Sequence, residues 1–344
     1  MEAVLYQHKD AGKLVCTACV RRCVLGEGQT GYCGIRKNNG GNLDLLVYGM
    51  PFGMHIDPIE KKPVLHAMPG AKILSFGTTG CNYGCRYCQN FDMSQRREVA
   101  GESMTPESIV SLAIRTGCRG IAYTYNEPTV FLEFAHDVGL EARKRGLKNI
   151  FVTNGYETRE AIEYASSFLD YITIDFKGNA NNNFYRKYIS VISADPIYDT
   201  IKNSLDFGMH VEVTDLVVPQ VGDDLKDAER MVDRIREIGG EDIPVSFLRF
   251  HPDYRMLDLP LTSVKTLEEH REMAIDHGMN YAYIGNVFGH KYESTYCPRC
   301  RQLLVKRNGF TSKIVGLDES GRCTSCGYST RFENMKASIP HPVM

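Results

Sequence analysis

Short apolar runs alternate with amphipathic stretches of helical period from about residue 72 to about residue 290. Short runs rich in β-branched residues and bounded by turn residues are typical of buried strands, whereas apolar positions that recur roughly every three to four residues indicate surface helices. The predicted strands are residues 72–76, 120–125, 149–153, 171–175, 211–218 and 245–250, and residues 281–284 form a further strand or a closing edge.

The amphipathic stretches between these runs begin with helix start signals. Thr105 precedes Pro106, and Thr266 with Glu269 has the spacing of a capping box. Repeated strand–helix units predict an α/β fold, in which a parallel sheet with helices outside it curls into a full or partial barrel. Active sites of such barrels lie at the C-terminal ends of the strands, so polar residues that follow the strands are candidate site residues.

Cysteine-rich segments flank the predicted barrel on both sides. Residues 1–70 are rich in Gly, Cys and turn dipeptides, and Pro51, Pro58, Pro63 and Pro69 indicate an irregular, extended passage into the core. We therefore predict three units: a Cys-rich segment at 1–70, the barrel at 71–290, and a zinc-ribbon-like module with a tail at 291–344.

Composition indicates an ordinary globular protein of 344 residues, with 43% hydrophobic and 24% charged residues and a net charge of −2. No leader pattern and no apolar run of about 18 residues is present, so we expect a cytoplasmic protein without a membrane partner. From Cys297 onward eight Lys/Arg, among them Lys336, stand against three Asp/Glu. Such a basic tail is either a solvated face or a contact for a polyanion.

Eleven of the twelve cysteines fall in tight groups, which favours metal or cluster ligation over disulfides. Cys81, Cys85 and Cys88 form a triplet. A structural zinc site needs four protein ligands, whereas a cubane cluster on three cysteines leaves one iron open for catalysis. The alternative is a zinc knuckle completed by a distant residue such as Cys118.

Two cysteine quartets remain. Cys297, Cys300, Cys323 and Cys326 form two Cys-x2-Cys pairs, which predict a zinc ribbon; a rubredoxin-type iron fits the same geometry, but the first pair lacks a following glycine. The N-terminal quartet is Cys16, Cys19, Cys23 and Cys33. Its crowded start suits a second iron–sulfur cluster, and four ligands without an open position suit Zn²⁺ equally.

The spacing Cys-x3-Cys-x2-Cys, with Tyr87 directly before the last cysteine, resembles the motif of the radical SAM superfamily. In that superfamily the three cysteines hold a 4Fe-4S cluster whose free iron chelates S-adenosylmethionine. The resemblance implies a partial (βα)6 TIM-like barrel, a 4Fe-4S cluster on the triplet and S-adenosylmethionine as cofactor.

Strand-end motifs sharpen the likeness. Asn126-Glu127-Pro128, Thr153-Asn154-Gly155 and Asp175-x-Lys177 resemble elements of the glycyl radical activating enzymes, such as pyruvate formate-lyase activating enzyme. Together with the two quartets, they make nearly the whole chain similar to the radical SAM proteins of the AmmeMemoRadiSam system.

This likeness implies roles for individual residues. Glu127 and Asn126 would receive the cofactor ammonium, Lys177 would pair with its carboxylate, and Asp175 and His251 would line the reacting pocket. Tyr87, Thr153 and Asn154 join the implied cofactor-binding set, and Asp175, Lys177 and His251 form the implied catalytic set. An ion pair on the barrel rim is the plainer interpretation of Asp175 and Lys177. The activating enzymes place a cation-binding aspartate where this chain has Val152, so the sequence leaves the cation site open.

The predicted function is reductive cleavage of S-adenosylmethionine, followed by hydrogen abstraction from a substrate that the subfamily likeness suggests is a protein glycine. A reductant such as ferredoxin or flavodoxin is then required. Radical modification of RNA, a peptide or a small molecule is the first alternative. A metal-binding scaffold that docks RNA or a protein partner is the second, and the density of polar residues at the strand ends argues against it.

Overall fold

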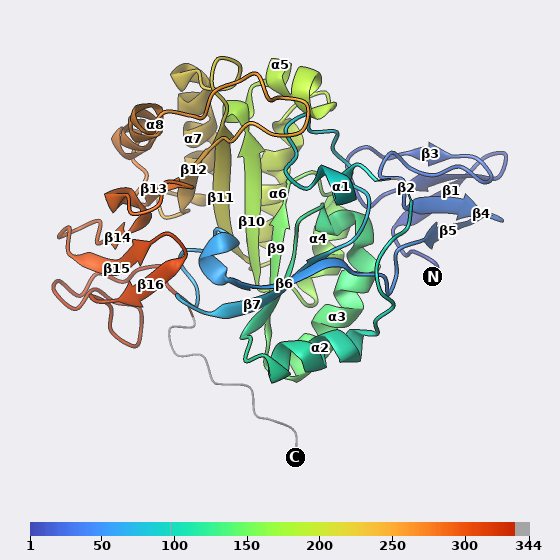
Figure 1. The fold of residues 1–344 in the computed structure, drawn as a ribbon, viewed down its shortest axis with the longest axis horizontal. Coiled ribbons are helices and arrows are strands. Elements are labelled where there is room, and N and C mark those ends of the chain that lie inside the picture. The colour runs from blue at the N-terminus through green and yellow to red at the C-terminus, as the bar shows by residue number, and fades with distance from the viewer. Residues whose placement is uncertain (97, 334–344) are drawn as a thin grey trace.

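The computed structural model describes residues 1–96 and 98–333, and its centre is one eight-stranded sheet (Figure 1). The strands follow the order β13-β12-β11-β10-β9-β8-β7-β6; β7 to β13 are parallel, and β6 is antiparallel to β7. The two edges do not pair with each other, so the barrel is open. The strands are β6 (Phe52–Pro58), β7 (Lys72–Gly77), β8 (Gly120–Tyr123), β9 (Lys148–Thr153), β10 (Tyr171–Lys177), β11 (His210–Val217), β12 (Val245–Arg249) and β13 (Ala282–Gly285).

Helices connect the parallel strands and pack on one face of the sheet: α3 contacts β8 and β9, α6 contacts β10 and β11, and α8 contacts β12 and β13. Right-handed crossovers place them on the same side. The helices are α1 (Phe91–Ser94), α2 (Pro106–Arg115), α3 (Leu132–Lys144), α4 (Arg159–Ser166), α5 (Asn182–Phe184), α6 (Asp195–Asp206), α7 (Leu225–Gly239) and α8 (Val264–Asp276). Within the described part of the chain, none of these helices has the length and apolarity to cross a membrane.

The predicted strands are all present, each with ends within two residues of the prediction, and the α/β barrel class is confirmed. The prediction of an irregular passage before residue 70 was wrong in one respect, because it contains strand β6. Proline obscured this strand in the sequence. Pro58 ends β6 at the edge of the sheet, where a missing N–H costs no ladder hydrogen bond.

Helix starts were predicted with mixed success. Thr105 caps α2 by accepting a hydrogen bond from the Ser108 amide, with Pro106 in the first turn, as predicted. The capping box at Thr266 was wrong. Helix α8 begins three residues earlier, because the Ser263 hydroxyl accepts from the Thr266 amide and so satisfies one of the free N–H groups of the first turn.

The N-terminal segment forms a three-stranded sheet and a hairpin beside the barrel (Figure 1). Its strands are β1 (Tyr6–Lys9), β2 (Lys13–Cys16), β3 (Val24–Leu25), β4 (Arg36–Asn39) and β5 (Asn42–Leu45). Arg36 docks this segment on α3 through a buried bidentate pair with Glu133 and a 3.0 Å hydrogen bond from its Nε to the Val130 carbonyl. Removal of one partner of such a buried pair typically costs about 3–5 kcal/mol, so this pair determines where the segment sits.

The C-terminal segment forms a small antiparallel sheet of β14 (Thr295–Tyr296), β15 (Leu303–Asn308) and β16 (Thr311–Ile314). Arg307 anchors it, because its guanidinium donates to the Thr295 hydroxyl at 2.7 Å and to the Leu65 carbonyl at 2.5 Å. Phe332 stacks on the His66 ring with 4.4 Å between centroids. Lys336 of the predicted basic tail lies outside the described residues.

A buried histidine links the last described residues to the sheet. His210 at the start of β11 lies 3.0 Å from the Glu212 carboxylate and 3.3 Å from that of Glu333. Burial disfavours the charged ring, but these two carboxylates outweigh burial and raise the pKa of His210 to about 9 from its ordinary 6.5. A raised pKa stabilises the fold fully below about pH 6.5, and this stabilisation is lost as the pH rises through about 9.

We expect His210→Gln to flatten the decline in stability between pH 6.5 and pH 9.5, because the variant has no imidazolium to lose. Anaerobic urea unfolding at a series of pH values measures this, with the exposed His8→Gln as matched control. Parallel pH profiles for His210→Gln and the native chain would contradict the charged assignment.

Candidate active site

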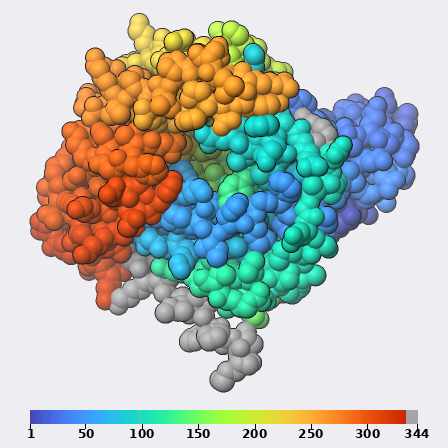
Figure 2. Space-filling view, in the orientation of Figure 1, coloured from blue at the N-terminus to red at the C-terminus, as the bar shows by residue number. Residues whose placement is uncertain are grey.

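A cavity of about 550 Å³ opens on the face of the molecule shown in Figure 2, in the hollow between the segments around residues 60, 90 and 250–285. It lies at the C-terminal ends of the parallel strands. Residues from the cysteine loop, from the ends of strands β8 to β13 and from the C-terminal sheet line it. Those used below are Lys61, Lys62, Cys81, Cys85, Tyr87, Cys88, Tyr125, Asn126, Glu127, Val152, Thr153, Asn154, Asp175, Lys177, His251, Arg307 and Phe310.

The cysteine loop leaves the end of β7 through two positions that only glycine can fill. A Cβ at Gly77 would overlap the Thr124 carbonyl and the Asn126 side chain, and a Cβ at Gly80 would overlap the Cys33 carbonyl. Gly80 also has φ of 89°, in the left-handed region. The loop is therefore pressed between the end of β8 and the N-terminal segment.

All three loop cysteines line the cavity, and Cys81 is buried. Burial raises the pKa of the Cys81 and Cys88 thiols, and raises the pKa of Cys85 to about 12. Thiolates at these positions need a positive centre to offset desolvation. Three cysteines on one cavity match the ligand number of a cubane cluster with one open iron, whereas a structural zinc site needs four protein ligands.

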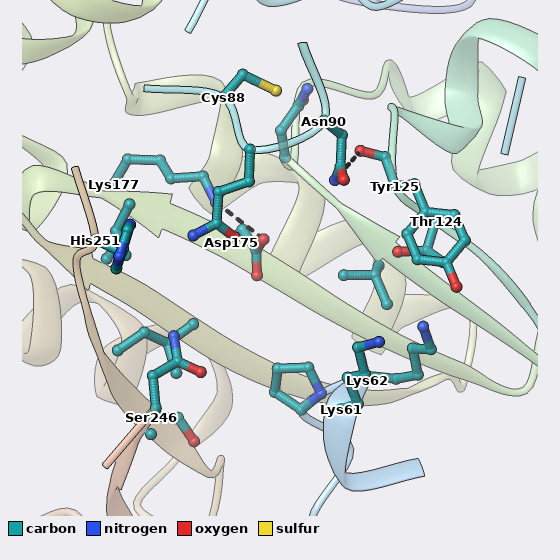
Figure 3. Close-up of a pocket in the computed structure, with 18 of the residues that line it drawn as sticks. Lys61, Lys62, Cys88, Asn90, Thr124, Tyr125, Asp175, Lys177, Ser246 and His251 are labelled. Atoms are coloured by element: carbon teal, nitrogen blue, oxygen red, sulfur yellow. Dashed lines mark hydrogen bonds and ion pairs between the residues drawn. The ribbon is translucent and has the colours of Figure 1, made fainter. Parts of the chain in front are cut away.

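Asp175 and Lys177 lie together at the end of β10, joined by a 3.0 Å ion pair (Figure 3). The Thr214 hydroxyl donates to the second oxygen of Asp175. Burial alone would lower the pKa of Lys177, but Asp175 raises it above the ordinary value, so the ammonium stays charged. His251 is exposed at the rim of the same cavity (Figure 3). The structure thus brings the three predicted catalytic residues to one wall.

Glu127 is buried, and its carboxylate joins two strand ends. Oε1 accepts from the Thr129 amide, the Thr129 hydroxyl and the Thr153 hydroxyl, and Oε2 accepts from the Asn154 amide at 2.8 Å. Burial and the neighbouring carboxylate of Glu157 raise the pKa of Glu127 to about 8, against the lowering effect of these donors. Each buried carboxyl group thus disfavours ionisation of the other.

Asn126 clamps the start of the cysteine loop. Its Oδ1 accepts from the Thr78 amide at 3.1 Å, and its Nδ2 donates to the Thr78 hydroxyl and, at 2.7 Å, to the Gly80 carbonyl. Asn154 supports the loop one step further along, since its Nδ2 donates to Asn82 Oδ1 at 2.7 Å. The side chains of Asn126 and Asn154 are thus engaged by the protein itself.

Tyr87 packs against Phe184 and Phe250, with ring centroids 5.9 and 6.0 Å apart. Its buried hydroxyl has no hydrogen-bond partner in the described part of the chain. Val152 presents an alkyl group to the cavity at the position where a cation-binding aspartate was considered. Among the described residues that line the cavity, Glu60 Oε2 and Arg307 Nε are likewise buried without a hydrogen-bond partner.

The sequence interpretation missed Lys61 and Lys62, which Figure 3 shows on the side of the cavity opposite Cys88, and Tyr125, whose carbonyl accepts from Asn90 Nδ2 at 3.0 Å. Lys62 is buried, and its Nζ lies 2.6 Å from Asp57 on β6 and 4.7 Å from the centre of the Tyr125 ring. Burial lowers the pKa of Lys62 to about 8, although Asp57 acts in the opposite direction. The signal was the adjacent lysine pair just before the first parallel strand.

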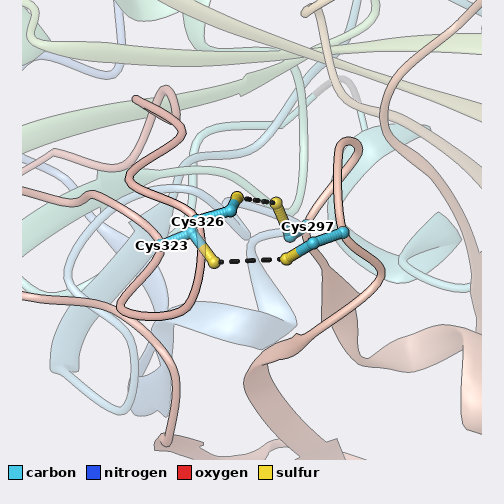
Figure 4. Close-up of side chains that lie close together, drawn as sticks. Cys297, Cys323 and Cys326 are labelled. Carbon is cyan, nitrogen blue, oxygen red and sulfur yellow. Dashed lines mark hydrogen bonds between the residues drawn. The ribbon is translucent and has the colours of Figure 1, made fainter.

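The C-terminal quartet forms a compact tetrathiolate (Figure 4). Sγ of Cys297 lies 3.6 Å from that of Cys326, and the same distance separates Cys300 from Cys323. Tetrahedral sulfur ligands about 2.3 Å from Zn²⁺ lie about 3.8 Å apart, so the spacing fits one metal ion. Arg301, with φ of 62°, holds the left-handed position that Gly327 holds in the second pair.

The profile of the radical SAM superfamily matches residues 76–235. The protein MJ0808 of Methanocaldococcus jannaschii, described as uncharacterized, is 43% identical to this chain over 329 residues, which are 95% of this chain and 97% of MJ0808. Among solved structures, SuiB of Streptococcus suis bound to S-adenosylmethionine has a TM-score of 0.51 and 13% identity, over 70% of this chain and 56% of SuiB. This likeness shows a shared fold.

A domain of pyruvate-formate lyase-activating enzyme from Bacteroides vulgatus aligns with 48% of this chain and 99% of that domain, with a TM-score of 0.43 and 15% identity.

We expect Asn126→Ala to loosen the cysteine loop, because residues 78 and 80 lose their shared clamp. Faster amide hydrogen exchange over residues 78–88 and a lower iron content after anaerobic reconstitution should result. Asn203→Ala on the outer helix α6 is the matched control. Unchanged exchange and iron content in Asn126→Ala would show that the glycine contacts alone hold the loop.

Proposed function

We propose, from the premise that this chain belongs to the radical SAM superfamily, that it cleaves S-adenosylmethionine reductively and abstracts a hydrogen atom from a bound substrate. Membership of the superfamily indicates an enzyme, which disfavours the scaffold hypothesis. The observation that carries the proposal is the convergence of Cys81, Cys85 and Cys88 with the Asp175–Lys177 pair on one cavity. When bound, the 4Fe-4S cluster and S-adenosylmethionine would supply an electron and a 5′-deoxyadenosyl radical.

The residues on the cavity wall divide the work of holding the zwitterionic cofactor. The positively charged Lys177 would pair with the cofactor carboxylate while its ammonium also donates to Asp175. Glu127 Oε2 accepts from the Asn154 amide alone among the described residues, so it has room for the cofactor ammonium. Arrival of that cation would lower the pKa of Glu127.

Asn126, Thr153 and Asn154 act as positioning residues in this proposal. Their side chains tie the cysteine loop to β8 and β9, so the cluster ligands and the cofactor groups share one frame. The buried Tyr87 hydroxyl, which has no hydrogen-bond partner among the described residues, would donate to or accept from the cofactor. His251 stands at the exposed rim, where it can contact substrate.

The substrate that we propose is a glycine-containing segment of a protein, as in the activating enzymes. The support is the open mouth of the cavity and a wall that includes Phe310 of the C-terminal hairpin, which suit a macromolecule that enters from outside. Lys61 and Lys62 supply positive charge at the far side. Radical modification of RNA, a peptide or a small molecule is the alternative, and mass analysis of products distinguishes the two.

We propose that the chain has three units, at residues 1–70, 71–290 and 291–344. In this proposal the C-terminal quartet binds Zn²⁺. The protein is cytoplasmic and receives electrons from a reductant such as ferredoxin or flavodoxin. Rubredoxin-type iron remains the alternative occupant of that quartet. The hairpin between β15 and β16 lines the cavity, so the C-terminal module belongs to the substrate wall as well as to the fold.

Replacement of Cys81, Cys85 or Cys88 by Ala is expected to abolish formation of 5′-deoxyadenosine, because two thiolates hold a cubane cluster poorly. The measurement is chromatography of reduced anaerobic reaction mixtures, with circular dichroism to verify folding. Cys118→Ala, a buried cysteine away from the cavity, is the control. More than trace product from any loop variant would overturn the assignment.

Lys177→Ala is expected to weaken S-adenosylmethionine binding about ten- to hundredfold, since a charge-assisted hydrogen bond is worth roughly 1.5–3 kcal/mol. Loss of the ammonium also leaves the Asp175 carboxylate facing the cofactor carboxylate, and repulsion between these two negative charges weakens binding further. Calorimetry on the reconstituted protein measures the affinity, with the exposed Lys226→Ala as control. Equal affinities for both variants would return Asp175 and Lys177 to a rim ion pair.

A further inference from the structure

The four N-terminal cysteines line a second cavity of about 20 Å³ behind the cysteine loop. We propose that this cavity is the site of a second iron–sulfur cluster, through which an electron from a one-electron donor protein reaches the first. The cluster site is independent of the proposed function, whereas the electron-transfer role rests on it. The cavity is lined by Cys16, Ala18, Cys19, Arg21, Cys23, Gly31, Cys33, Arg36, Asn82, Thr129 and Val130.

The two quartets differ in what lies between their cysteines. Cys297, Cys300, Cys323 and Cys326 form a compact group whose sulfurs lie within 4.8 Å of one another, as ligands of one ion do. Cys16, Cys19, Cys23 and Cys33 line a cavity instead. A cavity between four cysteines suits a cluster, because its irons and sulfides occupy the space between the ligands.

An unpaired donor at the wall of this cavity points to a ligand. Asn82 is 1% exposed, and its Nδ2 has no hydrogen-bond partner in the described part of the chain, while its Oδ1 accepts from Asn154. A buried amide N–H without a partner costs about 1–3 kcal/mol, unless a bound group accepts it. The Tyr32 amide likewise donates to Cys23 Sγ at 3.5 Å. Sulfide and thiolate atoms of a cluster are such acceptors, and donors of this kind tune its reduction potential.

The surroundings suit a centre that exchanges electrons. Ala18, Gly31 and Val130 exclude water from the cavity, and Cys16, Cys19 and Cys33 are buried. Cys23 is only half-buried, so one side of the site lies near the surface where a donor protein can dock.

The cysteine loop touches this site through its backbone. The Cys33 carbonyl lies against Gly80, and Arg21 Nε donates to the Asn82 carbonyl at 2.5 Å. Asn82 follows Cys81 in sequence and lines the second cavity, so one residue contacts both sites. With both clusters bound, one electron from a reduced ferredoxin or flavodoxin would pass through the second cluster to the first and reduce S-adenosylmethionine there, so that the donor is oxidised and S-adenosylmethionine is reduced.

Iron and sulfide counts on anaerobically reconstituted protein test the site. We expect about eight irons in the native chain and about four in both the Cys81/Cys85/Cys88→Ala and the Cys16/Cys19→Ser variants. About four irons in the native chain, none in the triple variant and zinc in the N-terminal quartet would overturn the proposal. Mössbauer spectra separate cubane iron from a rubredoxin-type iron in the C-terminal quartet.

A ligand-sparing variant covers the case in which Cys16/Cys19→Ser fails to fold. Asn82→Ala should keep the iron count and lower the potential of one of two cluster signals in an electron paramagnetic resonance titration, because a donor to cluster sulfur is lost. Identical titrations for the variant and the native chain would contradict the placement of Asn82 at the cluster. A zinc site would give no second signal at all.

The electron-transfer role is tested separately, by comparing two reductants. The ratio of S-adenosylmethionine cleavage with reduced flavodoxin to cleavage with dithionite should fall in Cys16/Cys19→Ser that retains about four irons. An unchanged ratio would refute the relay while leaving the cluster site standing. Absence of cleavage by the native chain with either reductant would instead refute the proposed function.

Discussion

The close approach of Gly77 to the backbone at Thr124 is the contact on which the rest of the site depends. Parallel pairing of β7 with β8 places Phe76 beside Tyr123, so the two strands end at the same level of the sheet. A side chain at Gly77 would separate them. Because the loops after β7 and β8 touch, Asn126 can hydrogen-bond to Thr78 and Gly80. The register of the sheet therefore determines where the following cysteines lie.

Buried carboxylates organise the layer beneath the loop. Glu127 and Glu157 share the hydroxyls of Thr129 and Thr153, which links β8 to β9 and to the start of α4. Two adjacent buried carboxyl groups cannot both ionise cheaply, and the pKa of each is raised. A bound cation beside these carboxyl groups would offset the cost of ionisation. Such a preorganised network is more useful to a cofactor site than to a structural barrel.

The flanking modules complete a barrel that its own strands leave open. Tyr283 on the edge strand β13 reaches His66, just before β7, with 2.6 Å between its hydroxyl and Nε2. Arg307 of β15 then bonds the Leu65 carbonyl across the same gap. The C-terminal module thus closes the seam between the open edges and supplies Phe310 to the cavity, while the N-terminal module supports the cysteine loop from behind.

The chain's own pattern determined the parallel strands, the barrel class and the three cysteine groups, because period, turn residues and ligand spacing are local properties. It also named residues 175, 177 and 251, since strand ends of a parallel sheet converge on one edge. It could not tell that Asn126 and Glu127 are held by loop and strand partners, or that Lys61 and Lys62 join the cavity from the short turn that follows the edge strand β6. Those facts depend on contacts between distant segments. The cavity that the four N-terminal cysteines line likewise became visible only in the tertiary structure, where the Cys33 carbonyl lies against Gly80 of the cysteine loop.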